Sequence, residues 1–194
     1  MVPFHFEREA CPQSTNNGMT DVPVVIVPYD PDWPRQFERE RTLLTTVFGS
    51  DAVIEHVGST SVPGVGAKPI IDAMVGLRDL AEAESRIGQM EAAGFQYVPD
   101  YEADLPDRRY FVRPRQLPRT SHVHCVVRDG EFWHKHLKFR DHLRRNADVA
   151  AEYYQLKCRL AQLHGRKREA YTAAKSEFIQ RALGADDIAP PHAP

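Results

Sequence analysis

The residue types best suited to holding an anion gather in one stretch, GSTSVPGVGAKPIID. Gly58 allows close backbone approach, and the N–H and hydroxyl groups of Ser59 and Thr60 can bind phosphate oxygens. Lys68 stands near enough in the chain to reach the same anion. Asp72 follows in an apolar run, and a carboxylate beside a phosphate needs a counter-charge, which a divalent metal supplies. The stretch predicts a phosphate-binding turn beside a metal-binding aspartate; a surface aspartate after an ordinary tight turn is the alternative.

A second candidate group is the histidine pair in SHVHCVV. His122 and His124 are two residues apart on an expected strand, so their side chains point to the same face. With Asp72 they would form a set of two imidazoles and one carboxylate, which suits Zn²⁺, Mn²⁺ or Fe²⁺. His124 is also our candidate for a catalytic group beside Asp72. The alternative is that both histidines make ordinary hydrogen bonds or contact a ligand phosphate.

Arginine is the residue that can clamp a phosphate through two parallel hydrogen bonds. Arg108 and Arg109 stand together in the segment DRRYF. Because side chains alternate along a strand, only one of the two would face a binding cleft. We assign Arg109 to the phosphate.

The elements that must position these residues follow from hydrophobic spacing and from proline and glycine signals. Strands are expected at 23–28, 52–57, 69–75, 95–98, 109–113 and 121–127, and helices at about 30–49 and 79–94. After Gly130 the spacing is helical only. The expected fold class is α+β, a mixed sheet with helices followed by a C-terminal helical unit.

Length and composition agree with an α+β core followed by a C-terminal helical unit. The chain has 194 residues, 42% of them hydrophobic, which is enough to bury a core. We expect a flexible leader at 1–21, an α/β core at 22–129, helices packed on it at 130–184 and a disordered tail at 185–194. No apolar run reaches the roughly 20 residues of a membrane span, and the N-terminus lacks the features of a signal peptide, so a cytoplasmic location is expected. The net charge of -2 and the absence of a recognised motif make nucleic acid an unexpected partner.

Several separated motifs, HVGSTSVPGVGAKPIID, DRRYF, SHVHCVV and FRDHLR, occur in an order that closely resembles the GrpB family. This is a nucleotidyltransferase-like family whose domain also occurs fused to dephospho-CoA kinase. The resemblance covers residues 23–183. The family pattern includes Lys157 and Lys175 on the last helices, which by analogy would close over a bound nucleotide.

The resemblance implies a nucleotidyltransferase fold of the polymerase β type. On that template Gly58 and Ser59 correspond to the Gly-Ser signature that holds the phosphates, and Asp72 corresponds to the first carboxylate that binds Mg²⁺. Met74 stands where the second carboxylate is expected, and a thioether is a poor ligand for a hard cation. Two-metal phosphoryl transfer needs carboxylates for both ions, so this departure bears directly on the chemistry.

Three functions follow as hypotheses. The first is a divergent nucleotidyltransferase that uses a nucleoside triphosphate and Mg²⁺ or Mn²⁺ and modifies an unknown small acceptor. The second is a module that binds a phosphorylated small molecule without catalysis. The third is a metal-dependent enzyme of other chemistry, built on Asp72 with His122 and His124. The oligomeric state is not predicted.

Overall fold

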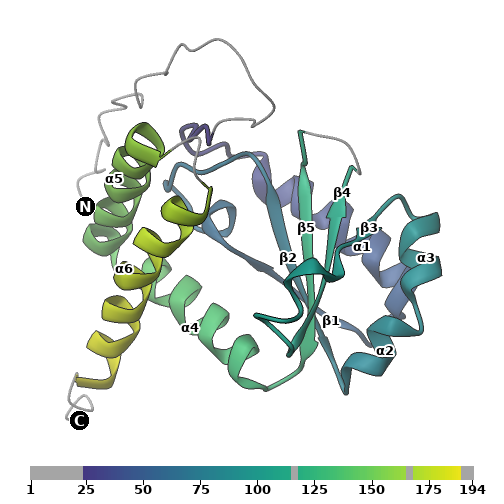
Figure 1. The fold of residues 1–194 in the computed structure, drawn as a ribbon. Helices are drawn as coiled ribbons and strands as arrows, with labels where there is room; N and C mark the ends of the chain where they lie inside the picture. The colour runs from purple at the N-terminus through teal and green to yellow at the C-terminus, as the bar shows by residue number, and fades with distance from the viewer. Residues whose placement is uncertain (1–23, 115–117, 165–167, 189–194) are drawn as a thin grey trace.

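The protein, in a computed structural model, is built on one mixed sheet (Figure 1). The structure describes residues 24–114, 118–164 and 168–188. The strands of the sheet are β1 (Val53–Val57), β2 (Ile71–Leu77), β3 (Gln96–Tyr97), β4 (Arg108–Arg113) and β5 (Ser121–Val127), in the spatial order β1-β2-β5-β4-β3. Strands β2 and β5 run parallel, and the other neighbouring pairs run antiparallel. This arrangement confirms the α+β class.

Two sets of helices cover the two faces of the sheet (Figure 1). On one side lie α1 (Trp33–Phe48), α2 (Leu80–Glu84) and α3 (Ile87–Ala92); on the other lie α4 (Glu131–Arg145), α5 (Ala147–His164) and α6 (Arg168–Ile188). Two short 3₁₀ turns complete the fold, one at Ser59–Ser61 and one at Pro99–Tyr101.

The larger core lies between α1 and the sheet. Trp33, Phe37 and Leu44 recur at helical spacing, are buried, and pack on the sheet face formed by Ala73 and Val75 of β2. Side chains alternate along β2, so its other residues, including the aspartate of the candidate site, face α4, α5 and α6. The sheet face toward α1 therefore belongs to the hydrophobic core, and the face toward α4, α5 and α6 is available for a binding site.

Three sequence expectations need correction. The expected strand at 23–28 is an isolated bridge between Val27 and Ala67, because Pro28 has no N–H with which to extend a ladder. The expected helix at 79–94 is broken into α2 and α3 near Arg86, whose Nε donates to the carbonyl oxygen of Val47 at the end of α1. Strand β2 begins at Ile71, two residues after the expected start, since the expected first residue is a proline.

The expected ends of the chain fall mostly outside the described residues. The leader at 1–21 lies there entirely, and so does the tail beyond Ile188. Helix α6 continues past residue 184, the expected end of the C-terminal helices, to Ile188.

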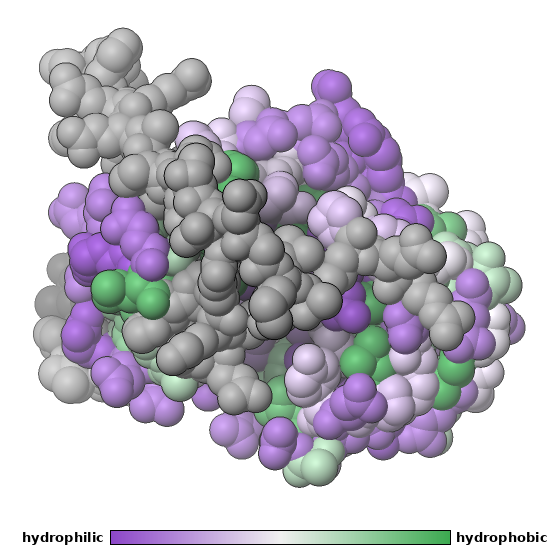
Figure 2. Space-filling model, turned by 45° about the horizontal axis from the view of Figure 1, so that its top comes forward, coloured by the Kyte–Doolittle hydropathy of each residue, from purple (hydrophilic) through white to green (hydrophobic). Residues whose placement is uncertain are grey.

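Within the described part of the chain, no helix is long and apolar enough to cross a membrane. On the face shown in Figure 2 the described residues are mainly hydrophilic, and the hydrophobic ones occur as separate patches.

Candidate functional site

The 3₁₀ turn at Ser59–Ser61 directly follows β1 and is closed by its own side chains. The hydroxyl of Ser61 donates to the carbonyl oxygen of Gly58 over 2.6 Å. Gly58 has φ 70° and ψ -174°, a conformation that is nearly exclusive to glycine. A Cβ at this position would lie 2.3 Å from Oδ2 of Asp72, so the turn and the aspartate are in direct contact only because residue 58 has no side chain.

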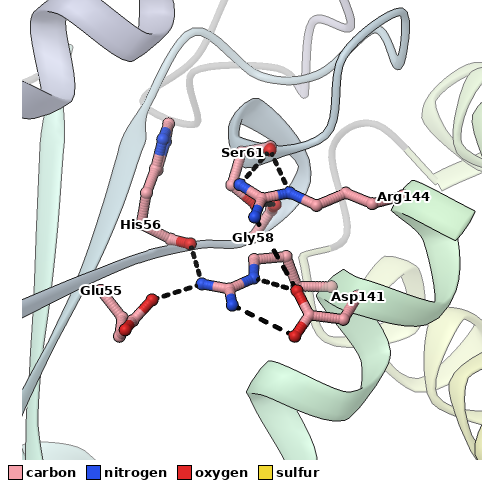
Figure 3. Close-up of polar contacts among 7 residues, drawn as sticks. Glu55, His56, Gly58, Ser61, Asp141 and Arg144 are labelled. Atoms are coloured by element: carbon pink, nitrogen blue, oxygen red, sulfur yellow. Dashed lines mark hydrogen bonds and ion pairs between the residues drawn. The ribbon is translucent and has the colours of Figure 1, made fainter.

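Helix α4 fixes this turn through two arginines (Figure 3). Nε and a terminal nitrogen of Arg144 both donate to the carbonyl oxygen of Ser61, over 3.0 and 2.8 Å. Arg140 donates to the carbonyl oxygen of His56 over 3.1 Å and to the carboxylate of Glu55 over 2.6 Å. Sequence reasoning missed both arginines as parts of the site. Their signals were a spacing of four residues on an expected helix and their place in the motif FRDHLR.

A cavity of about 160 Å³ lies between the turn, the starts of β2 and β5, and helices α5 and α6. Seven of the residues singled out from the sequence line it: Ser59, Thr60, Lys68, Asp72, His122, Lys157 and Lys175. They come from five separate segments of the chain. The fold thus brings most of the expected phosphate-binding residues to one place.

Lys157 is the most deeply buried of the cavity lysines, with 2% of its surface exposed. Its ammonium donates to the carbonyl oxygen of Gly66 and lies 4.7 Å from the ring centroid of Tyr153. Burial, and then the nearby charge of Lys175, lower the pKa of Lys157 well below its usual value. An anion in the cavity would offset both effects, because it supplies the missing counter-charge.

Asp72 and His122 are register partners on the parallel strands β2 and β5. Nδ1 of His122 lies 3.1 Å from Oδ1 of Asp72. Burial alone would raise the pKa of Asp72, but hydrogen bonding from His122, and then from the N–H of His124, outweighs it and holds the pKa well below its ordinary range. The carboxylate is therefore ionised at neutral pH, and it orients the imidazole of His122 at the cavity wall.

The tautomer of His124 is set by an arginine. A terminal nitrogen of Arg108 lies 3.2 Å from Nδ1 of His124, and a guanidinium can only donate, so Nδ1 accepts and the proton of the neutral ring resides on Nε2. Burial lowers the pKa of His124, which keeps the ring neutral. Its Nε2 lies 3.8 Å from Oδ1 of Asp72 and presents a proton to it rather than a lone pair.

This geometry does not fit the expected metal set of Asp72, His122 and His124, because a metal ligand must present a lone pair. Nδ1 of His122 is directed at the carboxylate, which leaves Nε2 as the nitrogen of this ring that carries a lone pair. Among the residues described in the structure, no group of three or more His, Cys, Asp or Glu side chains has an arrangement that could hold a metal ion. The metal site stays a prediction from sequence, and no metal-dependent step is derived from it.

Met74 lies on the same face of β2 as Asp72 but is fully buried. It packs with Val57, Val126 and Trp133 in an apolar cluster beneath α4. The position of the second carboxylate in the template is thus part of the hydrophobic core.

The assignment of Arg109 to the phosphate needs correction. Its guanidinium pairs with Glu84 at 2.7 Å and lies 3.7 Å from Glu102, on the side of the sheet that α2 covers. Arg108 occupies the other face, where its guanidinium carbon stands 4.6 Å from the ring centroid of Tyr110. The alternation of side chains was expected correctly, but neither arginine lines the phosphate cavity.

Acid should destabilise the fold through His56, beside the turn. This buried ring stacks on Phe37 at a centroid distance of 4.5 Å, and burial lowers its pKa from 6.5 to about 4, while the charge of Asp72 opposes the shift and that of Arg144 adds to it. The unfolded chain then binds the proton first, so stability is lost as the pH falls from about 6.5 toward 4. Between pH 7 and 4.5 we expect a loss of about 2 kcal/mol from this residue.

Urea unfolding of the wild type and of His56→Gln at both pH values measures this loss. His134→Gln, on the exposed side of α4, is the matched control. An equal pH dependence in the wild type and His56→Gln would show that His56 does not carry the effect.

Comparison with known proteins places this arrangement in a family. The family model described as GrpB protein matches residues 23–185. The chain belongs to the GrpB family. A crystal structure described as conserved protein GrpB from Enterococcus faecalis has a TM-score of 0.74 and 34% identity to this GrpB-family chain, and the match covers 84% of this chain and 99% of that one. The fold is accordingly nucleotidyltransferase-like.

Proteins related in sequence support the family assignment, and one of them is described as a kinase. The UPF0157 protein YqkA of Bacillus subtilis is 38% identical over 82% of this chain and 46% of its own length, and the glutamate-rich protein GrpB of Alkalihalophilus pseudofirmus is 32% identical over 86% and 97%. A dephospho-CoA kinase of Mycolicibacterium paratuberculosis is 30% identical over 82% of this chain and 45% of its own length. The chain thus spans about half of two of these proteins and nearly all of the third.

Proposed function

We propose that the 160 Å³ cavity binds the phosphate portion of a phosphorylated small molecule, with a nucleotide or coenzyme fragment as the class of ligand. The observation that carries the proposal is the convergence of three lysines, Lys68, Lys157 and Lys175, with the hydroxyls of the 3₁₀ turn on one small cavity. Ligand pockets for whole molecules measure roughly 300–1,000 Å³, so this volume suits a phosphate group rather than a complete nucleotide.

The charges in the cavity favour such a ligand. Asp72 is the carboxylate in its lining, and hydrogen bonding to His122 already satisfies part of its charge. The lining holds three lysines and one carboxylate, and Lys157 is destabilised as a cation by its burial. A phosphate between the lysines would form charge-assisted hydrogen bonds with them.

The relatives agree with this class of ligand. The similarity to a protein described as dephospho-CoA kinase links the family with a nucleotide-related context, in which coenzyme and nucleotide phosphates are at hand. A cytoplasmic location, where such metabolites are made, is part of the same proposal.

Nucleotidyl transfer to a small acceptor is the second candidate. Asp72 and His122 in the cavity wall favour it, because a carboxylate that orients an imidazole is a common proton-accepting pair. Incubation with labelled nucleoside triphosphates and an acceptor pool, with and without Mg²⁺ or Mn²⁺, tests it. A labelled product formed by the wild type but not by Asp72→Asn would favour transfer over binding alone.

Removal of one cavity lysine should weaken phosphate binding. Lys175→Met keeps the length of the side chain and removes its charge, and the loss of one charge-assisted hydrogen bond should weaken pyrophosphate binding about tenfold or more. Isothermal titration calorimetry with pyrophosphate, ATP and coenzyme A precursors measures the effect.

Arg181→Met is the matched control, since Arg181 lies on the same helix, is largely exposed and pairs with Glu152 at 3.0 Å outside the cavity. Equal affinity in the wild type and Lys175→Met, or no binding of any of these ligands to the wild type, would contradict the proposed function.

A further inference from the structure

A second and larger cavity lies against the same turn. Its volume is about 470 Å³, within the range of pockets that hold small molecules. The turn separates the two cavities: Ser59 and Thr60 line the phosphate cavity, whereas Ser61 lines the larger one. Thr60 and His56 connect them through a hydrogen bond of 3.0 Å between Oγ1 and Nε2.

The lining of the larger cavity is mainly apolar. Pro63 and Val65 form the wall on the side of the loop, and Leu143 and Ala150 form the wall on the side of α4 and α5. The loop that contains Pro63 and Val65 is fixed to α5, because Lys157 donates to the carbonyl oxygen of Gly66. The cavity is thus bounded by elements that are fixed to one another and favours an apolar body of a ligand.

One cation in the wall, Arg144, shares its acidic partner Asp141 with Arg140. Arg140 takes both nearby carboxylates, Glu55 at 2.6 Å and Asp141 at 2.7 Å. Arg144 lies 3.8 Å from Asp141 and otherwise donates to a backbone carbonyl oxygen (Figure 3). Its side chain is 39% exposed and lines the cavity.

His56, Tyr29 and Tyr154 also line this wall, and none of them is a carboxylate that would compete with an anionic ligand for Arg144. Burial, and then the charge of Arg140, lower the pKa of Arg144, whereas the charges of Asp141 and Glu55 raise it. His56 is neutral at pH 7, because its pKa is about 4.

We propose that this cavity is a second ligand site, which binds a small molecule with an apolar body and a carboxylate that faces Arg144. The site is independent of the phosphate cavity and lies across the turn from it. The two ligands would be bound at the same time, with only residues 59–61 between them.

The test uses phenylacetate and hexanoate as probes, with phenylacetamide and hexanol as uncharged counterparts, in ligand-observed NMR titrations of the full chain. The wild type should bind the carboxylates at least fivefold more tightly than their uncharged counterparts. Ala151→Leu fills the cavity from α5 and should weaken carboxylate binding at least tenfold. Ala147→Leu, from the first turn of the same helix, is a second blocking variant.

Ala81→Leu makes the same substitution at an exposed helical position outside the cavity and should bind the probes as the wild type does. Pyrophosphate binding should be unchanged in Ala151→Leu, and pyrophosphate should not displace the probes. Binding of the carboxylate probes would therefore stand even if the wild type did not bind pyrophosphate. The proposal is overturned if none of the probes binds, if both blocking variants bind them normally, or if pyrophosphate competes with them.

Discussion

Met74→Asp, which restores the second carboxylate of the polymerase β template, is expected to destabilise the protein by about 4 kcal/mol rather than to create a metal site. Met74 is fully buried against Val57, Val126 and Trp133. Its register partner on β1 is Glu55, so an aspartate there would add a like charge across the strand pair. Such a loss approaches the whole stability of many domains, about 5–15 kcal/mol.

Met74→Leu, which conserves volume and polarity, is the control and should cost less than about 1.5 kcal/mol. Urea unfolding of the three proteins at pH 7 gives the comparison. If Met74→Asp unfolds at the same urea concentration as the wild type, or becomes more stable on addition of Mg²⁺ or Mn²⁺, position 74 is not the core position described above. In that case the two-metal chemistry of the template regains support.

The sequence predicted the fold class because the local signals agree with the tertiary structure. Strand β5 has the expected bounds, 121–127, and α1 begins three residues after the expected start and ends one residue before the expected end. The helix expected from residue 79 begins there, with Asp79 as the N-cap of α2, since its carboxylate accepts from the N–H of Glu82 over 3.0 Å. These features depend on short-range chemistry, which a single sequence displays.

The incorrect expectations concern the orientation and burial of side chains, which contacts between distant parts of the chain determine. Which of Arg108 and Arg109 points to the α4 side of the sheet depends on the register of β4 against β5, which pairs Arg108 with Val126. The sequence displays the alternation but not its phase relative to the neighbouring strand. The burial of Met74 depends likewise on Trp133 of α4, nearly sixty residues away in the chain.

In the candidate site, too, local motifs were predictable from the sequence and features set by distant residues were not. The residues of the cavity were found from motif chemistry and from the resemblance to the family, and the fold brings seven of them together. The protonation states that argue against a metal were not predictable, since the tautomer of His124 is decided by Arg108 on a neighbouring strand. The two arginines that hold the turn come from α4, far from it in sequence.

Gly58→Ala is expected to destabilise the protein by about 3 kcal/mol and to abolish pyrophosphate binding. The backbone conformation at Gly58 costs a residue with a side chain about 1–3 kcal/mol. A Cβ would in addition lie 2.3 Å from Oδ2 and 3.0 Å from Cβ of Asp72, so the turn or β2 must shift. The displaced turn would no longer present Ser59 and Thr60 to the phosphate cavity.

Gly64→Ala distinguishes the cost of the backbone conformation from that of the steric contact with Asp72. Gly64 also has a positive φ, 80°, but a Cβ there would meet nothing within 4 Å. It should show a smaller loss of stability and keep pyrophosphate affinity within about twofold, on the order of 0.4 kcal/mol. Urea unfolding and calorimetric titration of both variants measure the difference. Equal losses in the two variants would mean that backbone strain alone matters and that the contact between Gly58 and Asp72 does not hold the turn. Normal pyrophosphate binding by a folded Gly58→Ala would mean that the turn does not form the phosphate site.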